Sequence, residues 1–540
     1  MKKLLIANRG EIAIRIGQTA NELGYSTIAV FPEDDANSLH VQQSDESIQI
    51  PGVGAQAYLN IEEIINAAKI CAADAVHPGY GFLSENPNFA KACDDAGINF
   101  VGPTADQLSI FGNKAGARAL AAELGIPLVP GTNEDTSLAA VIGFNDQHPD
   151  KGVVIKAISG GGGRGMRIVE DRNDIEKSYE RCKSEANLAF GDDRVYVELL
   201  IQRARHIEVQ ILGDGAGGVT HLWERDCSTQ RQNQKIVEVA PSPNMPDSTR
   251  TALLQASVNM ASHASYRGVG TFEFLVNADQ PDEFFFIEAN ARLQVEHTVT
   301  EAITGLDLVA LQLQIAAGKT LDELGLNEPP VTKGYAIQCR INMETPGKKG
   351  MFKPTGGTIN IFEPPSGPRI RVDTFGYAGY KTSTRYDSLL AKLIVHSQSD
   401  DFSVCAEKTV RALRQFRLEG FKVNLPFLQA LVGSQDFLRA TLTTRYIDLN
   451  LASLVSEENG DSAPGKAGLA GTKLNTKDPL AVLALGKSDA PSQAQEVTTL
   501  SAAIDGPTGT TAVPAPLQGT IITLLVSEGD LVFSGQELAV

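Results

Sequence analysis

The most constraining feature of this sequence is a polar run that directly follows a short apolar one. Residues 284–287 read FFFI, and residues 288–297 read EANARLQVEH. A short apolar, aromatic run of this kind predicts a buried strand. Side chains alternate between the two faces of a strand, so Glu288, Asn290 and Arg292 are expected to share one face, and Glu296 belongs to the same alternating set. The pattern therefore predicts an acid, an amide and a cation side by side.

A second acid, Glu273, lies in another strand-like run, GTFEFLV, at residues 270–276. Two carboxylates and an amide on adjacent strands suit a hard cation such as Mg²⁺, which prefers oxygen ligands and often accompanies phosphate. We therefore predict a Mg²⁺ or Mn²⁺ site at Glu273, Glu288 and Asn290. The alternative is a solvated strand face with ordinary charges, and the glycine-rich segment described next argues against it.

That segment, VVIKAISGGGGRGMRIV at residues 153–169, predicts a strand, a glycine loop and a second strand. Glycines let backbone N–H groups approach phosphate oxygens, and Lys156 would add a cation. No Gly-Lys-Ser/Thr closes the loop, and no helix follows it, so it is neither a P-loop nor a dinucleotide fingerprint. Alone it could equally be a flexible hairpin tip. Together with the acids it predicts a mobile lid over a nucleotide.

The amino-terminal region alternates strand and helix patterns. Strands are expected at residues 3–7, 27–31, 75–76 and 99–101, with a helix at 11–23 between the first two. This βαβ order predicts a parallel sheet with helices on both faces, within an α/β and α+β protein. The turn at Asn8-Arg9-Gly10 departs from the dinucleotide pattern, so NAD binding is not expected.

Further helices are expected at residues 114–124, 300–317 and 404–416, with the lid at about 131–203 and a strand-rich start to the region after 334. A chain of 540 residues that is 42% hydrophobic is long enough for several cores. Its formal net charge of −18 argues against a nucleic-acid partner. Six scattered cysteines predict reduced thiols, without a disulfide framework or zinc site. No signal peptide or membrane-length apolar run is seen, which predicts a cytoplasmic protein with no membrane partner.

Taken together, these segments resemble the ATP-grasp fold of the biotin carboxylase family. The resemblance extends in order from about residue 2 to about residue 449. It is carried by Lys156 with its glycine loop, Glu198, Glu273, Glu288 and the runs IANRGEIA (6–13), HPGYGFLSEN (77–86), RHIEVQ (205–210), ERDCS (224–228), RLQVEH (292–297) and CRIN (339–342).

The resemblance implies an ATP-dependent ligase that makes carboxybiotin from biotin, bicarbonate and ATP by way of carboxyphosphate. It implies that bicarbonate is held by Lys235, Arg292, Gln294 and Val295, and that Glu296 is the base that accepts its proton. Arg340 would stabilise the enolate form of biotin. Lys235, Arg292, Glu296 and Arg340 are thus the expected catalytic residues. The expected ATP-binding residues are Lys114, Lys156, Gly162, Gly163, the adenine hinge Glu198, Leu199, Leu200 and Ile201, then His206, Asn233, Glu273 and Glu288.

Two departures from the family pattern lie around the nucleotide. Residues 230–235 read QRQNQK, with Gln232 and Asn233 where bacterial members often carry Arg and His. Asn233 can still hydrogen-bond but cannot carry charge. Leu199 stands where a lysine is common. These departures are expected to change the affinity for ATP, while the metal and bicarbonate residues are intact.

The expected domains are an amino-terminal pre-ATP-grasp domain (1–112), an ATP-grasp domain (113–330) and a biotin carboxylase carboxy-terminal domain (331–450). A linker (451–512) and a partial biotinyl, lipoyl-like β-domain (513–540) follow; the segment 478–485 has no assigned role. The last part contains no lysine, so no biotin-acceptor lysine is present. We therefore interpret the chain as part of a longer carboxylase that acts on free biotin or on a biotinyl carrier domain.

Three functions remain open at this point. The first is the biotin carboxylase half-reaction of an acyl-CoA or related carboxylase, which has a carboxyltransferase partner and is commonly a homodimer or higher oligomer. The others are a carbamoyl-phosphate-type ATP-grasp ligase and a non-catalytic nucleotide-binding scaffold. The final acceptor could be acetyl-, propionyl- or longer acyl-CoA, pyruvate or urea.

Overall fold

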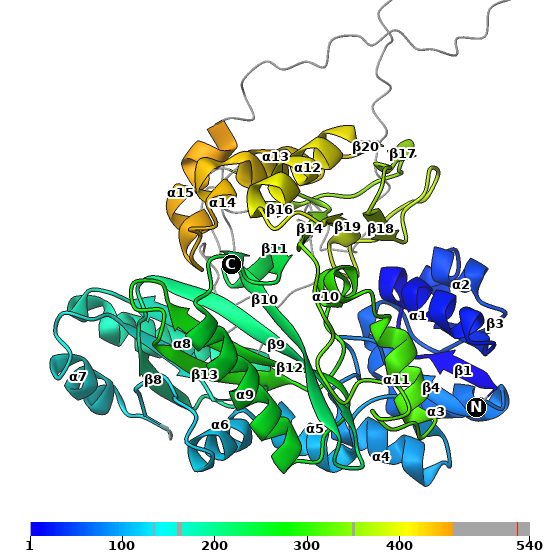
Figure 1. The fold of residues 1–540 in the computed structure, drawn as a ribbon, viewed down its shortest axis with the longest axis horizontal. Helices are drawn as coiled ribbons and strands as arrows, with labels where there is room; N and C mark the ends of the chain where they lie inside the picture. The colour runs from blue at the N-terminus through cyan, green and yellow to red at the C-terminus, as the bar shows by residue number, and fades with distance from the viewer. Residues whose placement is uncertain (1, 133–134, 159–164, 348–351, 457–525, 527–540) are drawn as a thin grey trace, which may run out of the picture.

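The protein was analysed as a computed structural model that describes residues 2–132, 135–158, 165–347, 352–456 and 526. The predicted linker, the segment 478–485 and nearly all of the predicted biotinyl segment lie outside the described residues. The glycines at 160–163 lie outside them too. The described part confirms the predicted mixed α/β class, with a parallel sheet followed by antiparallel ones (Figure 1).

The amino-terminal region is a five-stranded parallel sheet of order β3-β2-β1-β4-β5. Apolar side chains of β1 and β2 are buried. Helix α1 is buried at every position from residue 10 to residue 16, because it packs on β1 and β2 and also against more carboxy-terminal parts of the chain. The strands are β1 (Lys3–Ile6), β2 (Ser26–Phe31), β3 (Glu46–Gln49), β4 (Ala75–His77) and β5 (Asn99–Phe100). The helices are α1 (Gly10–Glu22), α2 (Leu39–Gln43), α3 (Ile61–Ile70) and α4 (Pro87–Asp95), with 3₁₀ turns η1 (Glu33–Asp35) and η2 (Ala55–Leu59).

The lid region is a three-stranded antiparallel sheet of order β7-β6-β8. Strands β6 (Val153–Ala157) and β7 (Met166–Val169) pair as a hairpin on either side of the glycine run, as the sequence predicts. Strand β8 (Val195–Leu199) pairs with the other edge of β6. This region is the cyan lobe in Figure 1. Helices α7 (Leu138–Asp146) and α8 (Ile175–Phe190) pack on this sheet, with η3 (Arg172–Asp174) just before α8. Helices α5 (Ala105–Gly112) and α6 (Lys114–Glu123) lie against β13 of the central sheet described next.

An eight-stranded sheet of order β13-β12-β9-β10-β11-β14-β19-β18 forms the centre of the molecule. It joins strands of the predicted ATP-grasp domain to strands of the predicted carboxy-terminal domain, because β11 pairs directly with β14. The strands are β9 (Ala204–Asp214), β10 (Val219–Arg231), β11 (Gln234–Ala240), β12 (Arg267–Asn277), β13 (Phe284–Asn290), β14 (Tyr335–Asn342), β18 (Ile370–Thr374) and β19 (Leu389–Ser397). The sequence patterns predicted neighbouring domains but not one shared sheet.

The remaining elements cover this sheet or extend it. Helix α9 (Asp247–His263) crosses one face of β9 and β10, and α12 (Phe402–Gln415) packs on β19. Short strands are β15 (Glu344–Pro346), β16 (Phe352–Pro354), β17 (Ile361–Glu363) and β20 (Arg417–Glu419). The last helices are α13 (Leu425–Gly433), α14 (Gln435–Leu438) and α15 (Tyr446–Ser456), which the sequence analysis did not predict.

One helix prediction is wrong. Residues 300–317 were expected to form a single helix, but the structure has α10 (His297–Thr304) and α11 (Leu308–Ala316), bent by 97°. Gly305 ends α10 with a φ of 74°, a left-handed conformation that glycine adopts without strain. Asp307 then begins α11 by accepting a hydrogen bond from the backbone N–H of Ala310. The apolar spacing continues through the bend. The capping residues Gly305 and Asp307 therefore determine where one helix ends and the next begins.

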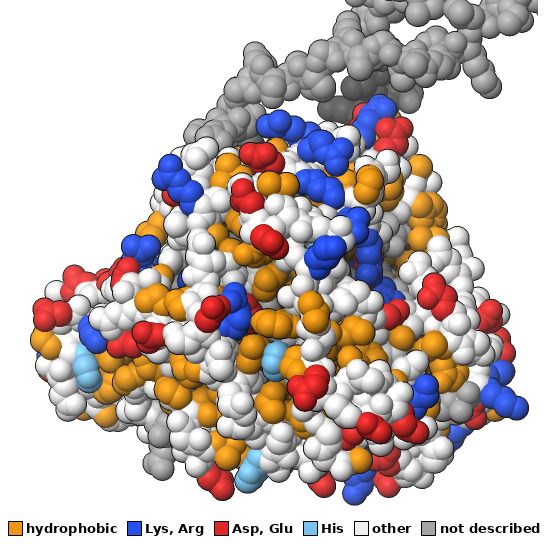
Figure 2. All heavy atoms as spheres, viewed as in Figure 1, with side chains coloured by type: hydrophobic (Ala, Val, Ile, Leu, Met, Phe, Trp, Pro, Cys, Tyr) orange, Lys and Arg blue, Asp and Glu red, His pale blue; other side chains and the backbone are white. Residues whose placement is uncertain are grey.

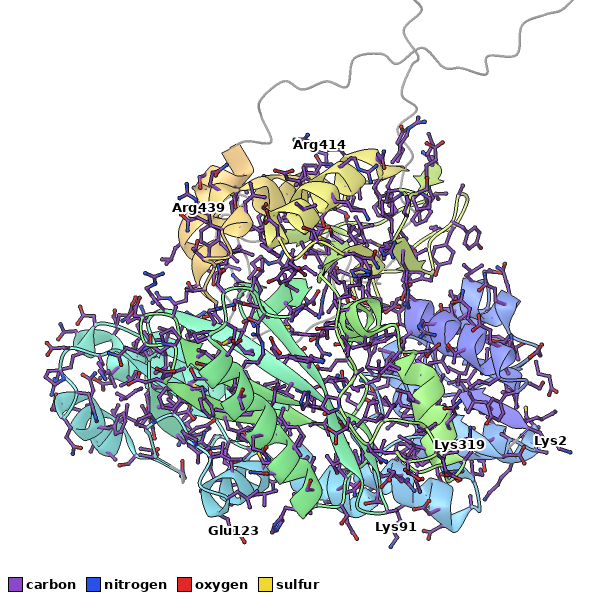
Figure 3. All side chains as sticks on the ribbon, in the orientation of Figure 1. Lys2, Lys91, Glu123, Lys319, Arg414 and Arg439 are labelled. Carbon is purple, nitrogen blue, oxygen red and sulfur yellow. The ribbon has the colours of Figure 1, made fainter. Side chains whose placement is uncertain are left out.

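All six cysteines are free thiols. Figure 2 shows Lys and Arg side chains over the upper, carboxy-terminal part of the described molecule and acidic side chains along its lower edges. Charged side chains such as Lys91, Glu123 and Arg414 project outward from the molecule (Figure 3).

Among the described residues no single helix is long and apolar enough to cross a membrane. Helices α10 and α11 reach the required length and apolar character only when they are counted together.

Buried neutral histidines predict that the protein is destabilised by mild acid. Burial lowers the pKa of His40 to about 4 and that of His77 to about 3, and it holds the pKa of His297 well below its ordinary value. In the unfolded chain each takes up a proton near pH ~6.5, so their stabilising contribution is complete above that pH and declines as the pH falls toward the folded values. We expect each to remove about 1.4 kcal/mol of unfolding free energy per pH unit in this range.

Urea denaturation at pH 7 and at pH 5 measures this effect. His40→Gln should reduce the pH dependence of the unfolding free energy, whereas the same change at the exposed His263 should leave it unaltered. Equal pH dependence in the wild type and in His40→Gln would contradict the assignment to buried histidine.

Candidate active site

The two acids predicted to bind a metal lie directly opposite each other. Glu273 on β12 is the register partner of Glu288 on β13, and of Glu208 on β9. Asn290 donates its side-chain amide to Glu273 Oε1 at 2.8 Å, while Glu288 forms an ion pair with Lys114 at 2.9 Å. Two carboxylates and an amide, gathered on the adjacent strands β12 and β13, are a donor set that fits Mg²⁺ or Mn²⁺.

The reason given for placing Arg292 and Glu296 beside this pair needs correction. Strand β13 ends at Asn290, and residues 291–296 form an irregular loop before α10. Strand alternation therefore does not act beyond Asn290. The loop itself brings Arg292 close to Asn290. The Arg292 Nη2 donates to Asn290 Oδ1 at 2.9 Å, and the Arg292 Nε pairs with Glu85 at 2.9 Å.

Glu296 lies at the end of this loop, buried between two cations. Its carboxylate is 2.7 Å from Lys235 Nζ and 3.1 Å from Arg340 Nη2. Burial by itself would raise the pKa of Glu296, but Lys235, Arg340 and Arg225 outweigh it and hold the pKa well below its ordinary value. The carboxylate is therefore ionised at neutral pH.

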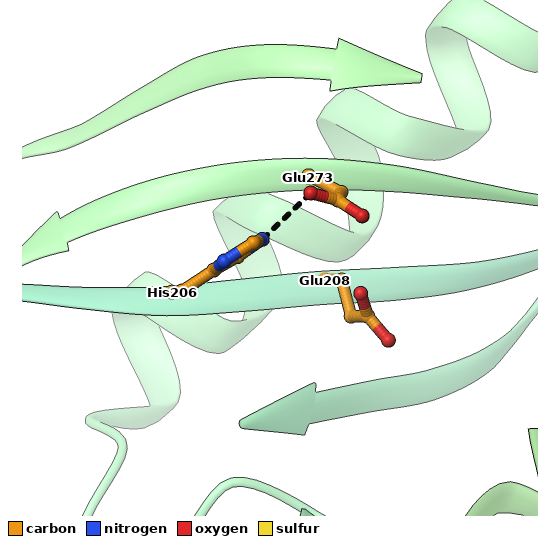
Figure 4. A group of neighbouring side chains, drawn as sticks. All are labelled: His206, Glu208 and Glu273. Atoms are coloured by element: carbon orange, nitrogen blue, oxygen red, sulfur yellow. Dashed lines mark hydrogen bonds and ion pairs between the residues drawn. The ribbon is translucent and has the colours of Figure 1, made fainter. Parts of the chain in front are cut away.

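Lys235 connects Glu296 to the metal-site acids. Its ammonium lies 2.5 Å from Glu208, 3.0 Å from Glu273 and 2.7 Å from Glu296. These carboxylates keep its pKa well above the ordinary value although burial opposes this. His206, on the other side of Glu273, approaches to 2.7 Å (Figure 4). His206, Glu208 and Glu273 offer ligand atoms within 4.8 Å of one another, and the Lys235 ammonium lies among these carboxylates.

Arg225 is a central residue that the sequence analysis quoted within a motif but gave no role. Its side chain is fully buried and ion-pairs with Glu208 at 2.5 Å. It also donates to Gln294 Oε1 at 2.9 Å. Its other acceptors are Gln210, Thr271 and Thr300. Arg225 thus connects Gln294 to the acid that holds Lys235. The i, i+2 spacing of His206 and Glu208 on one strand is a signal that could have revealed Glu208.

Arg340 is held by a residue that the sequence analysis did not identify. Glu238 on β11 is fully buried and binds the Arg340 guanidinium, and Gln338 donates to its other oxygen at 2.9 Å. Burial raises the pKa of Glu238, Arg340 lowers it and Glu296 raises it again, with a net rise. The pairing of β11 with β14 brings these residues together. No local sequence signal announces a contact between residues 102 positions apart.

One group of the residues predicted for ATP lies on β6, at the end of β8 and just after it, and at the start of α6. Lys156 pairs with Glu198, and Arg118 of α6 binds the other oxygen of Glu198 at 2.6 Å. Burial would lower the pKa of Lys156, but Glu198 raises it. Leu199 and Leu200 are buried and Ile201 is half-buried. Gly162 and Gly163 lie outside the described residues. Lys156 and Glu198 thus lie on the lid sheet, while Lys114 pairs with Glu288 on the central sheet.

Asn233 occupies the tip of the β10–β11 hairpin and is exposed. Gln232 and Asn233 have φ values of 47° and 64°, the left-handed pair required by a tight two-residue turn. Asparagine tolerates this conformation better than most residues. The turn gives a local reason for Asn233, and its contact with ATP remains a prediction.

Three family descriptions match consecutive parts of the chain. "Biotin carboxylase, N-terminal domain" matches residues 1–108, and "Biotin carboxylase C-terminal domain" matches residues 338–449. Between them, "Carbamoyl-phosphate synthase L chain, ATP binding domain" matches residues 113–324. The flanking matches identify which kind of ATP-grasp protein this is.

Curated relatives include pyruvate carboxylases. Human mitochondrial pyruvate carboxylase is 46% identical over 456 residues, covering 83% of this chain and 38% of the human protein. The Staphylococcus aureus pyruvate carboxylase is 45% identical, covering 83% of this chain and 39% of that protein. The chain thus spans about two fifths of the length of these relatives.

Solved structures of similar fold include biotin carboxylase domains. The domain of a single-chain bacterial carboxylase is 44% identical with a TM-score of 0.76, covering 85% of this chain and 99% of that one. The domain of Hydrogenobacter thermophilus 2-oxoglutarate carboxylase, a dimer solved with MgADP, ADP and bicarbonate, is 39% identical with a TM-score of 0.79. It covers 84% of this chain and 98% of that one. By sequence and fold, this chain belongs to the biotin carboxylase family of ATP-dependent ligases, whose members use ATP, Mg²⁺ and biotin.

Proposed function

We propose that this chain catalyses the ATP-dependent carboxylation of biotin by bicarbonate, as the first half-reaction of a biotin-dependent carboxylase. The observation that carries the proposal is the ionised Glu296 carboxylate, held by Lys235 and Arg340 at the end of the loop that contains Arg292 and Gln294. A base, a fork-shaped guanidinium and an ammonium around one small space suit a planar oxyanion that must lose a proton.

In this proposal the loop and its neighbours bind bicarbonate and activate it. Arg292 and Lys235 neutralise its charge, Gln294 and Val295 orient it, and Glu296 accepts its proton at a carboxylate oxygen. The deprotonated oxygen then attacks the terminal phosphorus of ATP, ADP leaves, and carboxyphosphate forms. Arg340, fixed by Glu238, would stabilise negative charge on the biotin ureido oxygen. Each charged group in the described part of the site is already held by a partner, so the geometry is preorganised.

The nucleotide would lie between the metal-site acids and the lid. Lys114, Lys156 and His206 would contact its phosphates, while the segment from Glu198 to Ile201 would line the base. Glu273, Glu288 and Asn290 would hold Mg²⁺ or Mn²⁺, which neutralises phosphate charge in phosphoryl transfer. Lys114 pairs with Glu288 and Lys235 with Glu273, and these ion pairs orient both acids.

The assignment predicts ATP hydrolysis that depends on both bicarbonate and biotin. The protein should hydrolyse ATP slowly with Mg²⁺ and bicarbonate, and the rate of hydrolysis should rise when free biotin is added. Phosphate release with each component omitted in turn measures this. Bicarbonate-dependent hydrolysis that ignores biotin would favour the carbamoyl-phosphate-type ligase, and absence of hydrolysis would favour a nucleotide-binding scaffold.

For the final acceptor we propose pyruvate in place of the acyl-CoA first expected. The support is that the human and Staphylococcus aureus relatives are pyruvate carboxylases.

The proposed partners follow from the same reaction. The biotin would be presented by a biotinyl carrier domain, and a carboxyltransferase would complete the reaction. A homodimer is proposed because the Hydrogenobacter domain is described as one. The cytoplasmic location stays a prediction, since some of these relatives are named mitochondrial.

A further inference from the structure

Lys392 is a fully buried lysine that the reaction scheme above does not use. It lies in the middle of β19, as the register partner of Arg340 on β14. Its side chain has no exposed surface. Burying an ammonium is costly unless it is paired and hydrogen-bonded, so its partners indicate why it is there.

Its partners come from two other parts of the chain. The ammonium donates to the backbone carbonyl of Val295 at 3.2 Å and lies 3.0 Å from the carboxylate of Glu11 in α1. Asp373 is farther away, at 3.7 Å, and is bound mainly by Arg371. Glu11 is also buried and accepts a hydrogen bond from the Tyr80 hydroxyl. A carboxy-terminal strand thus reaches the site loop with an ammonium held by the amino-terminal domain.

The contacted carbonyl lies at a sensitive point in the loop. Val295 immediately precedes Glu296, and residues 291–296 have no strand or helix bonding to fix them. The other carbonyls at this end of the loop are satisfied locally: His297 bonds to Gln294 O at 2.7 Å, and Val299 N–H bonds to Glu296 O at 3.3 Å. The described hydrogen bond to the Val295 carbonyl comes from Lys392. This bond orients the peptide unit that links Val295 to Glu296.

We propose that Lys392, held by Glu11, is a positioning residue for bicarbonate binding. It orients the peptide between Val295 and Glu296, and so sets where the loop presents its bicarbonate contacts and its base. This inference rests on the proposed function. It adds that the site is complete only when the amino-terminal helix α1, the loop and strand β19 are docked together.

The test replaces Lys392 by Met, which keeps the length of the stem and removes the donor. We expect the KM for bicarbonate to rise about tenfold or more, the size expected for the loss of a hydrogen bond from a charged donor. The KM for ATP should change less than twofold. Hydrogen exchange of the peptide covering residues 291–297 should become faster, and this readout needs no catalytic activity.

A double variant separates positioning from charge balance. Lys392→Met alone leaves the Glu11 carboxylate buried without its cation, whereas Glu11→Gln/Lys392→Met removes both charges. If positioning is the role, the double variant recovers thermal stability but keeps the high bicarbonate KM and the fast exchange. Recovery of both to wild-type values would overturn the inference and leave a purely structural ion pair.

Lys408 provides a matched control in the same domain. It donates to two backbone carbonyls, of Pro368 and of His396, the latter also on β19. Lys408→Met should leave the bicarbonate KM and the exchange of residues 291–297 unchanged. An equal effect from both lysines would contradict a specific role for Lys392. If the wild type lacks biotin-dependent activity, the proposed function fails, while the exchange measurement still decides whether Lys392 orders the loop.

Discussion

Replacing Glu296 by Gln is expected to slow biotin-dependent ATP hydrolysis by about 10²–10⁴-fold, the usual contribution of a general base. The amide keeps the size of the side chain but cannot accept the bicarbonate proton. Lys235 and Arg340 keep the wild-type carboxylate ionised, with its pKa below the ordinary value. The loss should therefore be similar at about pH 6 and about pH 8. Steady-state rates of phosphate release at both pH values measure it.

Two controls separate lost chemistry from lost structure. Glu328→Gln changes an exposed acid in the same way and should leave the rate unaltered. Nucleotide binding by Glu296→Gln without bicarbonate should stay near the wild-type value, because Glu296 is not among the predicted ATP contacts. A variant that keeps biotin-dependent hydrolysis within a few-fold of the wild type would remove Glu296 from its proposed role.

Replacing Glu288 by Gln is expected to raise the Mg²⁺ concentration needed for half-maximal activity by ~10–100-fold or more. Losing only a residue that supports a metal ligand already weakens metal binding by ~10–100-fold, and Glu288 is proposed as a ligand itself. Glu288 is one of two carboxylates that face each other across β12 and β13, so one would remain. Mg²⁺ titrations of ATP hydrolysis measure the shift. Metal-free nucleotide binding should change much less.

The same hairpin offers a matched control. Glu283, in the turn that precedes β13, is exposed and carries the same charge. Glu283→Gln should give the wild-type Mg²⁺ titration. Identical titrations for the wild type and Glu288→Gln would show that this carboxylate does not bind the catalytic metal, and the loss of its ion pair with Lys114 would then be the remaining effect to examine.

Local sequence patterns predicted the elements whose hydrogen bonds close within a short stretch of chain. The β6–β7 hairpin around the glycine run and the parallel pairing of β1 and β2 both formed as expected. Apolar spacing and turn residues act over a few positions, so they are readable from the sequence. The same spacing failed at Gly305, where one capping residue divided a continuous apolar pattern. The predicted domain limits remain predictions.

Prediction of the site was uneven for a related reason. The opposition of Glu273 and Glu288 follows from two neighbouring strands, and the structure places them in register. The nearness of Glu296 was expected from an alternation that ends at Asn290, so the expectation had the wrong physical basis. The loop holds Glu296 through contacts with Lys235 on β11 and Arg340 on β14.

The sequence by itself determined the α/β class and the family, and it predicted which acids, guanidinium and base form the site, because residue type and short spacing carry that information. Only the tertiary structure decided how they are held. The pairing of β11 with β14 joins two regions in one sheet and places Glu238 on Arg340, while Lys392 reaches from β19 to the site loop and to Glu11. A buried charge must find a partner, and for Arg340 and Lys392 the chain supplies that partner from a hundred or more residues away in sequence. The physical reason is that burial and strand pairing act between elements that only the completed fold brings together.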